Sequence, residues 1–409
     1  MKTYTRTKKR NLRRVLVCAI LGVVLSGSAI HAADWPNYRG ANYDGISSET
    51  GWQSTWREAP AISWKASLGW GFASMAVNKG RVYAMGNVDD NDIVYCFDAD
   101  SGKELWKQSY SCPLYKKNHE GGPAATPTVE GDGVYVFSKN GDALRLDANT
   151  GEVVWHKNLT KELDLENLTW YFSGSPLVVG DVVILNAGTA GVGLDKADGR
   201  VVWQNGKGPA GYATPVPATI GGQKCVVLFT LDEVLGVVAE TGKILWRHTW
   251  KTKYDVNAAD PIPVGDTVFI SSGYNKGCCL VKVSGAQCEE VWNNKNMRNH
   301  FNCSVLWKGH LYGFDESTLA CLDFKTGQSK WAQRGLGKGS LMLADGKLVI
   351  LSERGKLVIA DASPQEFKEL ASAQILEGKC WTVPVLANGR IYARNAAGDL
   401  VCVDVRSGK

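Results

Sequence analysis

Short apolar runs alternate with glycine-rich turns along nearly the whole chain. GVYVFSK at 133–139 is followed after a turn by ALRLD at 143–147, and KLVILSE at 347–353 by KLVIAD at 356–361. A run of small residues precedes such pairs, as in ATPTV at 125–129. Runs of this length and composition, bounded by turn residues, predict β-strands. No amphipathic helix is predicted, so the pattern indicates an all-β protein.

One template closes each of these units. It consists of an aspartate, a turn centred on glycine and an alternating strand that ends in tryptophan. The clear copies are DADSGKELW (98–106), DANTGEVVW (147–155), DKADGRVVW (195–203), VAETGKILW (238–246) and DFKTGQSKW (323–331), and VSGAQCEEVW (283–292) is a looser one. The repeat tryptophans are Trp64, Trp106, Trp155, Trp203, Trp246, Trp292 and Trp331, with 39 to 49 residues between neighbours. A period of this length is typical of β-propeller blades.

The two ends of the repeat array complete one another. A seventh copy starts at Asp361 without its tryptophan, and an eighth, 404–409, stops before its last strand. The segment AISWKA at 61–66 carries Trp64 and supplies that missing strand. We therefore predict an eight-bladed β-propeller of four-stranded antiparallel blades, whose last blade is closed by the N-terminal strand near Trp64. Closure of this kind removes open sheet edges.

The same alignment sets the domain boundaries and the role of the tryptophans. Residues 61–409 form a single propeller domain, and 33–60 form an N-terminal arm before it.

An indole at a fixed place on each outer strand packs against the neighbouring blade and buries a large apolar area. We therefore interpret the repeat tryptophans as structural residues.

The first 32 residues have the pattern of an export signal. They contain seven basic residues and no acidic one, then an apolar run at 15–25 and small residues up to Ala32. A basic start, a short apolar run and a small-residue end are typical of a signal peptide. We expect cleavage near Ala32 and a periplasmic or secreted protein. No later segment is long and apolar enough to predict a transmembrane helix.

Net charge gives no support for nucleic-acid binding. The formal charge is +5, and subtracting the seven basic residues of the signal leaves about −2 for the remainder. A nearly neutral body lacks the electrostatic attraction that binding to phosphate backbones requires. We therefore expect no nucleic-acid partner.

Ten cysteines follow the predicted signal peptide, and two of them are adjacent. Cys96, Cys321 and Cys402 occupy the same repeat position in different units, which favours separate buried thiols. Cys278 and Cys279 are neighbours in the segment GCCLVKV. They form either a vicinal disulfide or two buried thiols, and the sequence leaves both alternatives open.

Polar and aromatic residues gather in the segments that a propeller brings to one face. The segments that lead into the inner strands and the loops between the middle strands surround one mouth of the channel, where ligand sites usually lie. The candidate binding residues there are His119, Glu120, Trp170, Tyr171, Tyr212, Asn257, Asp260, Tyr274, His300, Lys338, Arg354, Trp381 and Arg394. We expect this face to bind a protein partner or a small ligand.

Motifs for specific chemistry are missing from these segments. The chain has no HExxH, CxxC or GxSxG sequence, and the glycine-rich run at 335–340 lacks the spacing and the following helix of a phosphate loop. No catalytic residue and no set of metal ligands is assigned from the sequence.

The repeat template, with the β-type runs before it, resembles that of the pyrroloquinoline quinone (PQQ)-like propeller superfamily. This superfamily includes quinoprotein alcohol dehydrogenases and the outer-membrane assembly lipoprotein BamB. Further similar stretches are DWPNYRGANYDG (34–45), EGGPAATPTV (120–129), AGYATPV (210–216), SSGYNKG (271–277) and RGLGKGSLMLADGKL (334–348).

The resemblance implies two possible functions. The dehydrogenases hold calcium with Glu, Asn and Asp, use an aspartate as base and stack PQQ between a tryptophan and a vicinal disulfide; only the pair Cys278–Cys279 is reminiscent of this set. The lipid-bearing cysteine of BamB has no counterpart. We expect a monomeric, exported, non-catalytic scaffold similar to BamB. The alternative is a PQQ- and calcium-dependent alcohol dehydrogenase-type oxidoreductase.

Overall fold

The computed structural model describes residues 1–4, 33–116 and 119–407. The predicted signal peptide therefore lies almost entirely outside the described residues. Within these ranges the only helix is the short α1 (Leu159–Glu162), and no helix is long and apolar enough to cross a membrane.

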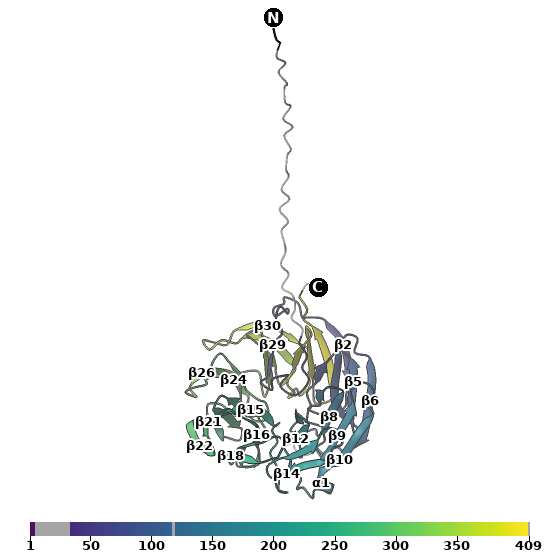
Figure 1. Ribbon diagram of the computed structural model, residues 1–409, viewed down its shortest axis with the longest axis vertical. Coiled ribbons are helices and arrows are strands. Elements are labelled where there is room, and N and C mark those ends of the chain that lie inside the picture. The colour runs from purple at the N-terminus through teal and green to yellow at the C-terminus, as the bar shows by residue number, and fades with distance from the viewer. Residues whose placement is uncertain (5–32, 117–118, 408–409) are drawn as a thin grey trace.

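Eight sheets lie around a common axis and form a ring (Figure 1), which confirms the predicted eight-bladed, all-β propeller. We number the blades along the chain and list their strands from the channel outward. Blade 1 contains β3 (Ala76–Asn78), β4 (Arg81–Val88), β5 (Asn91–Asp98) and β6 (Glu104–Ser111); blade 2 contains β7 (Thr128–Glu130), β8 (Gly133–Phe137), β9 (Asp142–Asp147) and β10 (Val153–Asn158); blade 3 contains β11 (Leu177–Val179), β12 (Val182–Leu185), β13 (Val192–Asp195) and β14 (Val201–Gln204); blade 4 contains β15 (Val216–Ile220), β16 (Gln223–Phe229), β17 (Glu233–Val237) and β18 (Ile244–Thr249).

The second half of the ring repeats this plan. Blade 5 contains β19 (Ile262–Val264), β20 (Thr267–Ser272), β21 (Gly277–Ser284) and β22 (Gln287–Asn294); blade 6 contains β23 (Val305–Trp307), β24 (His310–Asp315), β25 (Thr318–Asp323) and β26 (Ser329–Gln333); blade 7 contains β27 (Ser340–Ala344), β28 (Lys347–Leu351), β29 (Lys356–Asp361) and β30 (Glu369–Gln374). Blade 8 contains β31 (Val385–Ala387), β32 (Arg390–Arg394), β33 (Asp399–Asp404) and, as its outer strand, β2 (Ile62–Ser67).

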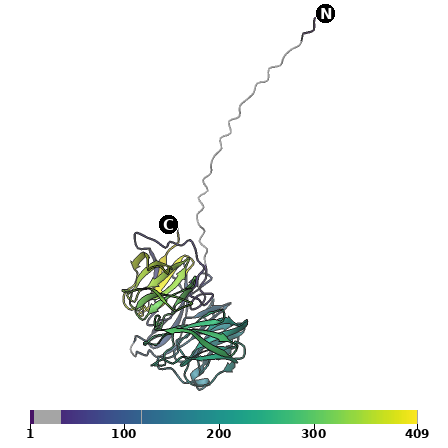
Figure 2. The same cartoon turned by 90° about the vertical axis from the view of Figure 1, so that its left-hand side faces the viewer.

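Blade 8 joins the two ends of the ring, as predicted. Strand β2 pairs antiparallel with β33, and Trp64 lies opposite Cys402 in the register. Figure 1 shows purple β2 beside the yellow strands near the C-terminal end, and the side view in Figure 2 places the green sheets of mid-chain on the far side of the ring from that end. The ring is therefore closed by backbone hydrogen bonds between residues more than 300 positions apart in sequence.

The repeat tryptophans join successive blades. Six of the seven donate the indole Nε1 hydrogen to a backbone carbonyl of the next blade: Trp64 to Ala99, Trp106 to Ala148, Trp155 to Lys196, Trp203 to Ala239, Trp292 to Phe324 and Trp331 to Ser363. We call this contact the tryptophan lock. The turn glycine of the next blade packs on the indole: a Cβ on Gly102 would lie 2.5 Å from the Trp64 ring. Repetition of the template around the ring is thus repetition of a contact between blades.

The predicted N-terminal arm packs onto the inner strands of several blades. Trp35 forms a bridge with Val77 of β3, and β1 (Ile46–Ser47) runs parallel to β27. Glu49 is fully buried and accepts hydrogen bonds from the backbone N–H groups of Asn388 and Gly389 in blade 8. The arm is therefore part of the folded ring and is bonded to blades 1, 7 and 8.

Candidate functional site

A cavity of about 440 Å³ lies at the mouth of the channel and is lined by residues from all eight blades and from the arm. We call this cavity the funnel. Of the thirteen candidate residues from the sequence, eight line it: His119, Trp170, Tyr212, Asp260, Tyr274, His300, Lys338 and Trp381. The lead-in segments thus converge on one cavity, whose volume is in the range of pockets for small ligands.

Aromatic rings follow one another around the funnel. We call this series the aromatic collar; its members are Tyr274, His300, Phe301, Trp381, Phe72, His119 and Trp170. Neighbouring ring centroids lie 4.5 to 5.9 Å apart, which is the contact range of aromatic pairs. Each of these side chains is only half-buried. The collar therefore presents apolar surface to whatever enters the funnel.

Lys338, His300 and Glu316 form a charged cluster on one side of the collar. Lys338 Nζ lies 2.8 Å from His300 Nδ1 and 3.8 Å from a Glu316 carboxylate oxygen. Burial and the nearby Lys338 charge lower the pKa of His300, although Glu316 opposes this effect. Since His300 is therefore neutral near pH 7, its Nδ1 can accept a hydrogen bond from the lysine.

A second ion pair links blades 8 and 2 across the funnel rim. Lys379 Nζ lies 2.7 Å from Glu120 and also 4.3 Å from the centre of the Trp381 ring. Burial raises the pKa of Glu120, but the hydrogen bond and charge of Lys379 outweigh that effect, so the pKa is lowered. Trp381 is fixed further by a 3.1 Å hydrogen bond from its Nε1 to Glu353. The collar is therefore held in position by charged neighbours.

Five candidate residues do not line the funnel. Asn257 is fully buried, donates hydrogen bonds to backbone carbonyls such as that of Thr230, and accepts one from the Tyr212 N–H. Arg394 is also fully buried and donates to the carbonyl of Gly69 at the junction of blades 8 and 1. The other three have separate places: Glu120 pairs with Lys379, Tyr171 packs on Tyr115, and Arg354 is exposed.

The structure adds funnel residues that the sequence analysis does not select. Phe72 and Phe301 stand in lead-in segments, where an apolar residue is easily assigned to the core. Lys139 comes from the loop between β8 and β9; it is 5% exposed, and its Nζ has no hydrogen-bond partner among the described residues. Tyr38 reaches the funnel from the arm. No sequence motif surrounds these four residues. Only their place in the repeat or in the arm could have identified them as funnel residues.

The floor of the funnel is a buried cluster that joins the arm to blade 5. Arg39 Nε lies 4.0 Å from an Asp260 carboxylate oxygen, and both side chains are almost fully buried. Arg39 also donates to the Ser304 carbonyl at 3.0 Å, and Tyr38 Oη lies 3.8 Å from Cys303 Sγ. Burial raises the pKa of Asp260 to about 6, although Arg39 opposes the shift. Asp260 is therefore a structural partner of the arm as well as a funnel residue.

This pKa predicts a pH-dependent stability. Between the unfolded value of 3.8 and the folded value of about 6, the folded protein binds more protons at Asp260 than the unfolded chain does. Stability from this group therefore falls as the pH rises from about 4 to about 6, by about 3 kcal/mol in total. Urea denaturation of wild type and Asp260→Asn at several pH values measures the difference. Parallel pH profiles for the two proteins would contradict the prediction.

The funnel residues do not fit a calcium-bound PQQ. Calcium takes six to eight oxygen ligands, but among the described residues Asp260 is the only carboxylate that lines the funnel, and it faces Arg39. Glu120 and Glu316, near the rim, are paired with lysines. The adjacent cysteines lie on β21, away from the funnel, and are free thiols.

Successive side chains on a strand point to opposite faces. Accordingly, Cys278 and Cys279 enter different core clusters, and no vicinal disulfide joins them. The described residues therefore do not assemble the donor set that the dehydrogenase alternative requires.

Comparisons with known proteins agree with the fold. BamB of Yersinia pestis is 23% identical over 83% of this chain and 88% of its own length. The crystal structure of BamB from Moraxella catarrhalis superposes with a TM-score of 0.64 at 16% identity, over 85% of this chain and all of that one. Quinohemoprotein alcohol dehydrogenase from Comamonas testosteroni gives a TM-score of 0.67 at 12% identity, over 92% of this chain and 81% of that one, which shows a shared fold.

The family-level match is more specific. The sequence model of the family described as outer membrane protein assembly factor BamB matches residues 42–206 and 120–333, which together cover more than half of the chain. This range includes all seven repeat tryptophans and much of the aromatic collar. The chain therefore belongs to the PQQ-repeat propeller family described as outer membrane protein assembly factor BamB.

Proposed function

We propose that this protein is an exported, non-catalytic binding scaffold that holds a protein partner at the funnel face. The observation that carries the proposal is the aromatic collar: seven half-buried rings surround one cavity at the mouth of the channel. Exposed apolar surface concentrated in one place is typical of a binding site. Catalysis would need a positioned acid, base, nucleophile or cofactor, whereas Glu120, Asp260 and His300 are each paired with a lysine or an arginine.

The shape and composition of the funnel favour a protein partner. A cavity of about 440 Å³ admits a few side chains of a partner. Aromatic residues in a desolvated centre, with charged residues at the rim, are the usual arrangement of protein interfaces. The collar supplies the centre, and the Lys379–Glu120 pair and the Lys338 cluster supply the rim. Because relatives are named outer membrane protein assembly factors, we propose a partner from that assembly machinery.

Location and oligomeric state complete the proposal. We propose that the protein is exported to the periplasm or secreted, that the signal peptide is removed near Ala32, and that the mature protein is a monomer. N-terminal sequencing of the exported protein identifies the cleavage site, and light scattering gives the mass in solution. A mature protein that retains the basic segment, or a stable dimer, would contradict these two points.

Site-specific photo-crosslinking in cells tests the partner and the face. Tyr254 is 53% exposed and its ring contacts Tyr274 of the collar, so a photo-reactive residue there reports on the funnel mouth. Lys79, in the exposed turn after β3, reports on the other end of the inner strands. We expect an adduct with an outer membrane assembly protein from position 254 and none from position 79. Adducts confined to position 79 would refute the proposed face.

Loss of one collar ring gives a quantitative prediction. Replacing Trp381 by alanine removes an indole that contacts Phe72 and Phe301. Truncation of a central interface aromatic costs about 2 kcal/mol, or about 30-fold in affinity. Binding of the crosslinked partner to purified Trp381→Ala measures the loss. Val153→Ala, at a 43% exposed position on outer strand β10, is the matched control and should bind like wild type. Equal affinity of the Trp381 variant would contradict a role for the collar.

A further inference from the structure

The seam between blades 4 and 5 lacks the tryptophan lock. Trp246 of β18 is 4% exposed, yet its Nε1 has no hydrogen-bond partner among the described residues. The looser repeat copy at 283–292 explains this difference. Only Gly285 and Ala286 connect β21 to β22, and a Cβ on Gly285 would meet nothing within 4 Å, so this turn does not pack on the indole.

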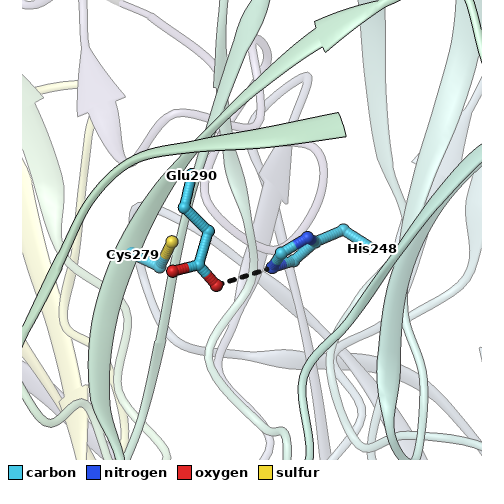
Figure 3. Close-up of side chains that lie close together, drawn as sticks. All are labelled: His248, Cys279 and Glu290. Carbon is cyan, nitrogen blue, oxygen red and sulfur yellow. Dashed lines mark ion pairs between the residues drawn. The ribbon is translucent and has the colours of Figure 1, made fainter. Parts of the chain in front are cut away.

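Three side chains with metal-binding atoms meet at this same seam. His248 follows Trp246 by two positions on β18 of blade 4, while Cys279 of β21 and Glu290 of β22 belong to blade 5. Their ligand atoms all lie within 4.8 Å of one another. Within the described ranges, no other group of three His, Cys, Asp or Glu residues has its ligand atoms this close together. Figure 3 shows the Glu290 carboxylate between the Cys279 sulfur and the His248 ring.

Burial makes these groups unusual in the absence of a ligand. Cys279 is fully buried, and the His248 side chain is 14% exposed, whereas Glu290 reaches solvent. His248 Nε2 makes no hydrogen bond within the described residues and has only a 3.4 Å contact with a Glu290 oxygen. A buried imidazole nitrogen without a hydrogen bond destabilises the fold. A cation between the three groups would satisfy it.

We propose that His248, Cys279 and Glu290 form a zinc site that joins blade 4 to blade 5 in place of the missing tryptophan lock. Zinc binds thiolate, imidazole and carboxylate in tetrahedral sites, with ligand bonds of about 2.0 to 2.3 Å. Three protein ligands leave one position for water, which has access from the exposed side of Glu290.

The surroundings support the orientation of the ligands. Asn293 Nδ2 donates a 3.0 Å hydrogen bond to Glu290 Oε2, which leaves Oε1 facing His248. Such outer contacts commonly orient metal-binding carboxylates. Burial, followed by the charge of Glu290, raises the pKa of Cys279 to about 12, so the free thiol is protonated. Zinc binding therefore forms the sulfur–zinc bond and releases the thiol proton to solvent.

Metal titration of the full mature protein tests the site. The protein is treated with a chelator, dialysed and titrated with Zn²⁺ by calorimetry, and Co²⁺ serves as a spectroscopic probe of thiolate coordination. We expect one metal ion per chain, a higher melting temperature in the presence of Zn²⁺ and a sulfur-to-cobalt charge-transfer band. Cys279→Ser should abolish the band, and Cys279→Ser and His248→Gln should each weaken zinc binding at least about 10-fold.

Neighbouring residues provide matched controls. Cys278→Ser changes the adjacent thiol, which lies in a different core cluster, and Glu289→Gln changes the neighbouring exposed carboxylate on β22. Both variants should keep wild-type affinity and the cobalt band. The proposal is overturned if zinc does not bind in a one-to-one ratio, or if Cys279→Ser binds it as tightly as Cys278→Ser does. Because this readout involves no partner, it is independent of the funnel.

Discussion

Deletion of residues 61–66 should remove most of the stability of the ring. The deletion takes away nearly all of β2, which pairs with β33, and leaves β33 as an open edge. It also removes Trp64, which is 8% exposed, contacts Phe97 and Tyr392 and donates to the Ala99 carbonyl. Loss of a buried tryptophan alone costs about 3 to 5 kcal/mol. Since whole domains are stable by only about 5 to 15 kcal/mol, the deletion should leave little folded protein at 37 °C.

Two further proteins make this test specific. Trp64→Ala isolates the indole and should lower the free energy of unfolding by about 3 to 5 kcal/mol in urea denaturation. Leu105→Ala, at a 43% exposed position on the outer strand β6, should stay within about 0.5 kcal/mol of wild type. A deletion protein as stable as wild type would contradict closure by β2.

Transfer of the strand to the other end of the chain provides a rescue. The last residues, 404–409, correspond to the start of the repeat template, so residues 62–67 appended after 409 place Trp64 eight positions after Asp404 and restore a complete copy. The appended strand should pair with β33 in the same antiparallel register as β2. We expect the deletion protein with this addition to recover most of its stability. Failure to recover would indicate that the N-terminal connection, and not the strand itself, stabilises blade 8.

The fold could be predicted because the repeat is local. Each template places an aspartate, a turn glycine and a tryptophan within nine residues, and the resulting strand order needs no long-range information. Closure of the ring could be predicted by counting copies of the template. The copy at 404–409 has no last strand of its own, and the segment that contains Trp64 supplies one. The same comparison locates one of the seams without a tryptophan lock, because the copy at 283–292 departs from the template where Trp246 lacks its partner.

The candidate site could be predicted only in part, because the direction of a side chain depends on neighbours distant in sequence. The sequence analysis predicts that residues in the lead-in segments and middle-strand loops face the channel mouth. His300 and Trp381 do line the funnel, whereas Asn257 and Arg394 do not. Those two point into the protein and satisfy backbone carbonyls between elements. Nothing local distinguishes a polar side chain that faces the cavity from one that caps a buried backbone.

The contribution of the arm to the site was not predictable from local pattern. Residues 34–45 carry no β-type run, and the contact between Arg39 and Asp260 joins positions more than 200 residues apart. The arm is bonded to inner strands of two blades, since β1 pairs with β27 and Trp35 with Val77. The floor of the funnel is therefore a product of tertiary structure.

Replacing Arg39 by alanine should destabilise this floor strongly. The change leaves the Asp260 carboxylate buried without its cation and leaves the Ser304 carbonyl without a donor. Removing one partner of a buried ion pair costs about 3 to 5 kcal/mol. Since burial already raises the pKa of Asp260 to about 6, loss of the cation raises it further, and the cost should shrink as the pH falls and the carboxyl becomes neutral.

A double-mutant cycle separates the ion pair from the other contacts of Arg39. In Arg39→Ala with Asp260→Asn, no buried charge remains, so the double variant should lose less stability than the sum of the two single variants, by at least about 1 kcal/mol at pH 7. Urea denaturation at pH 5 and pH 7 measures the four proteins. Additive losses, or a cost for Arg39→Ala that is equal at both pH values, would show that the arm is held by packing of Tyr38 and Trp35 and not by the charge on Arg39. The expected coupling would instead make the buried ion pair the contact that fixes the arm beneath the funnel.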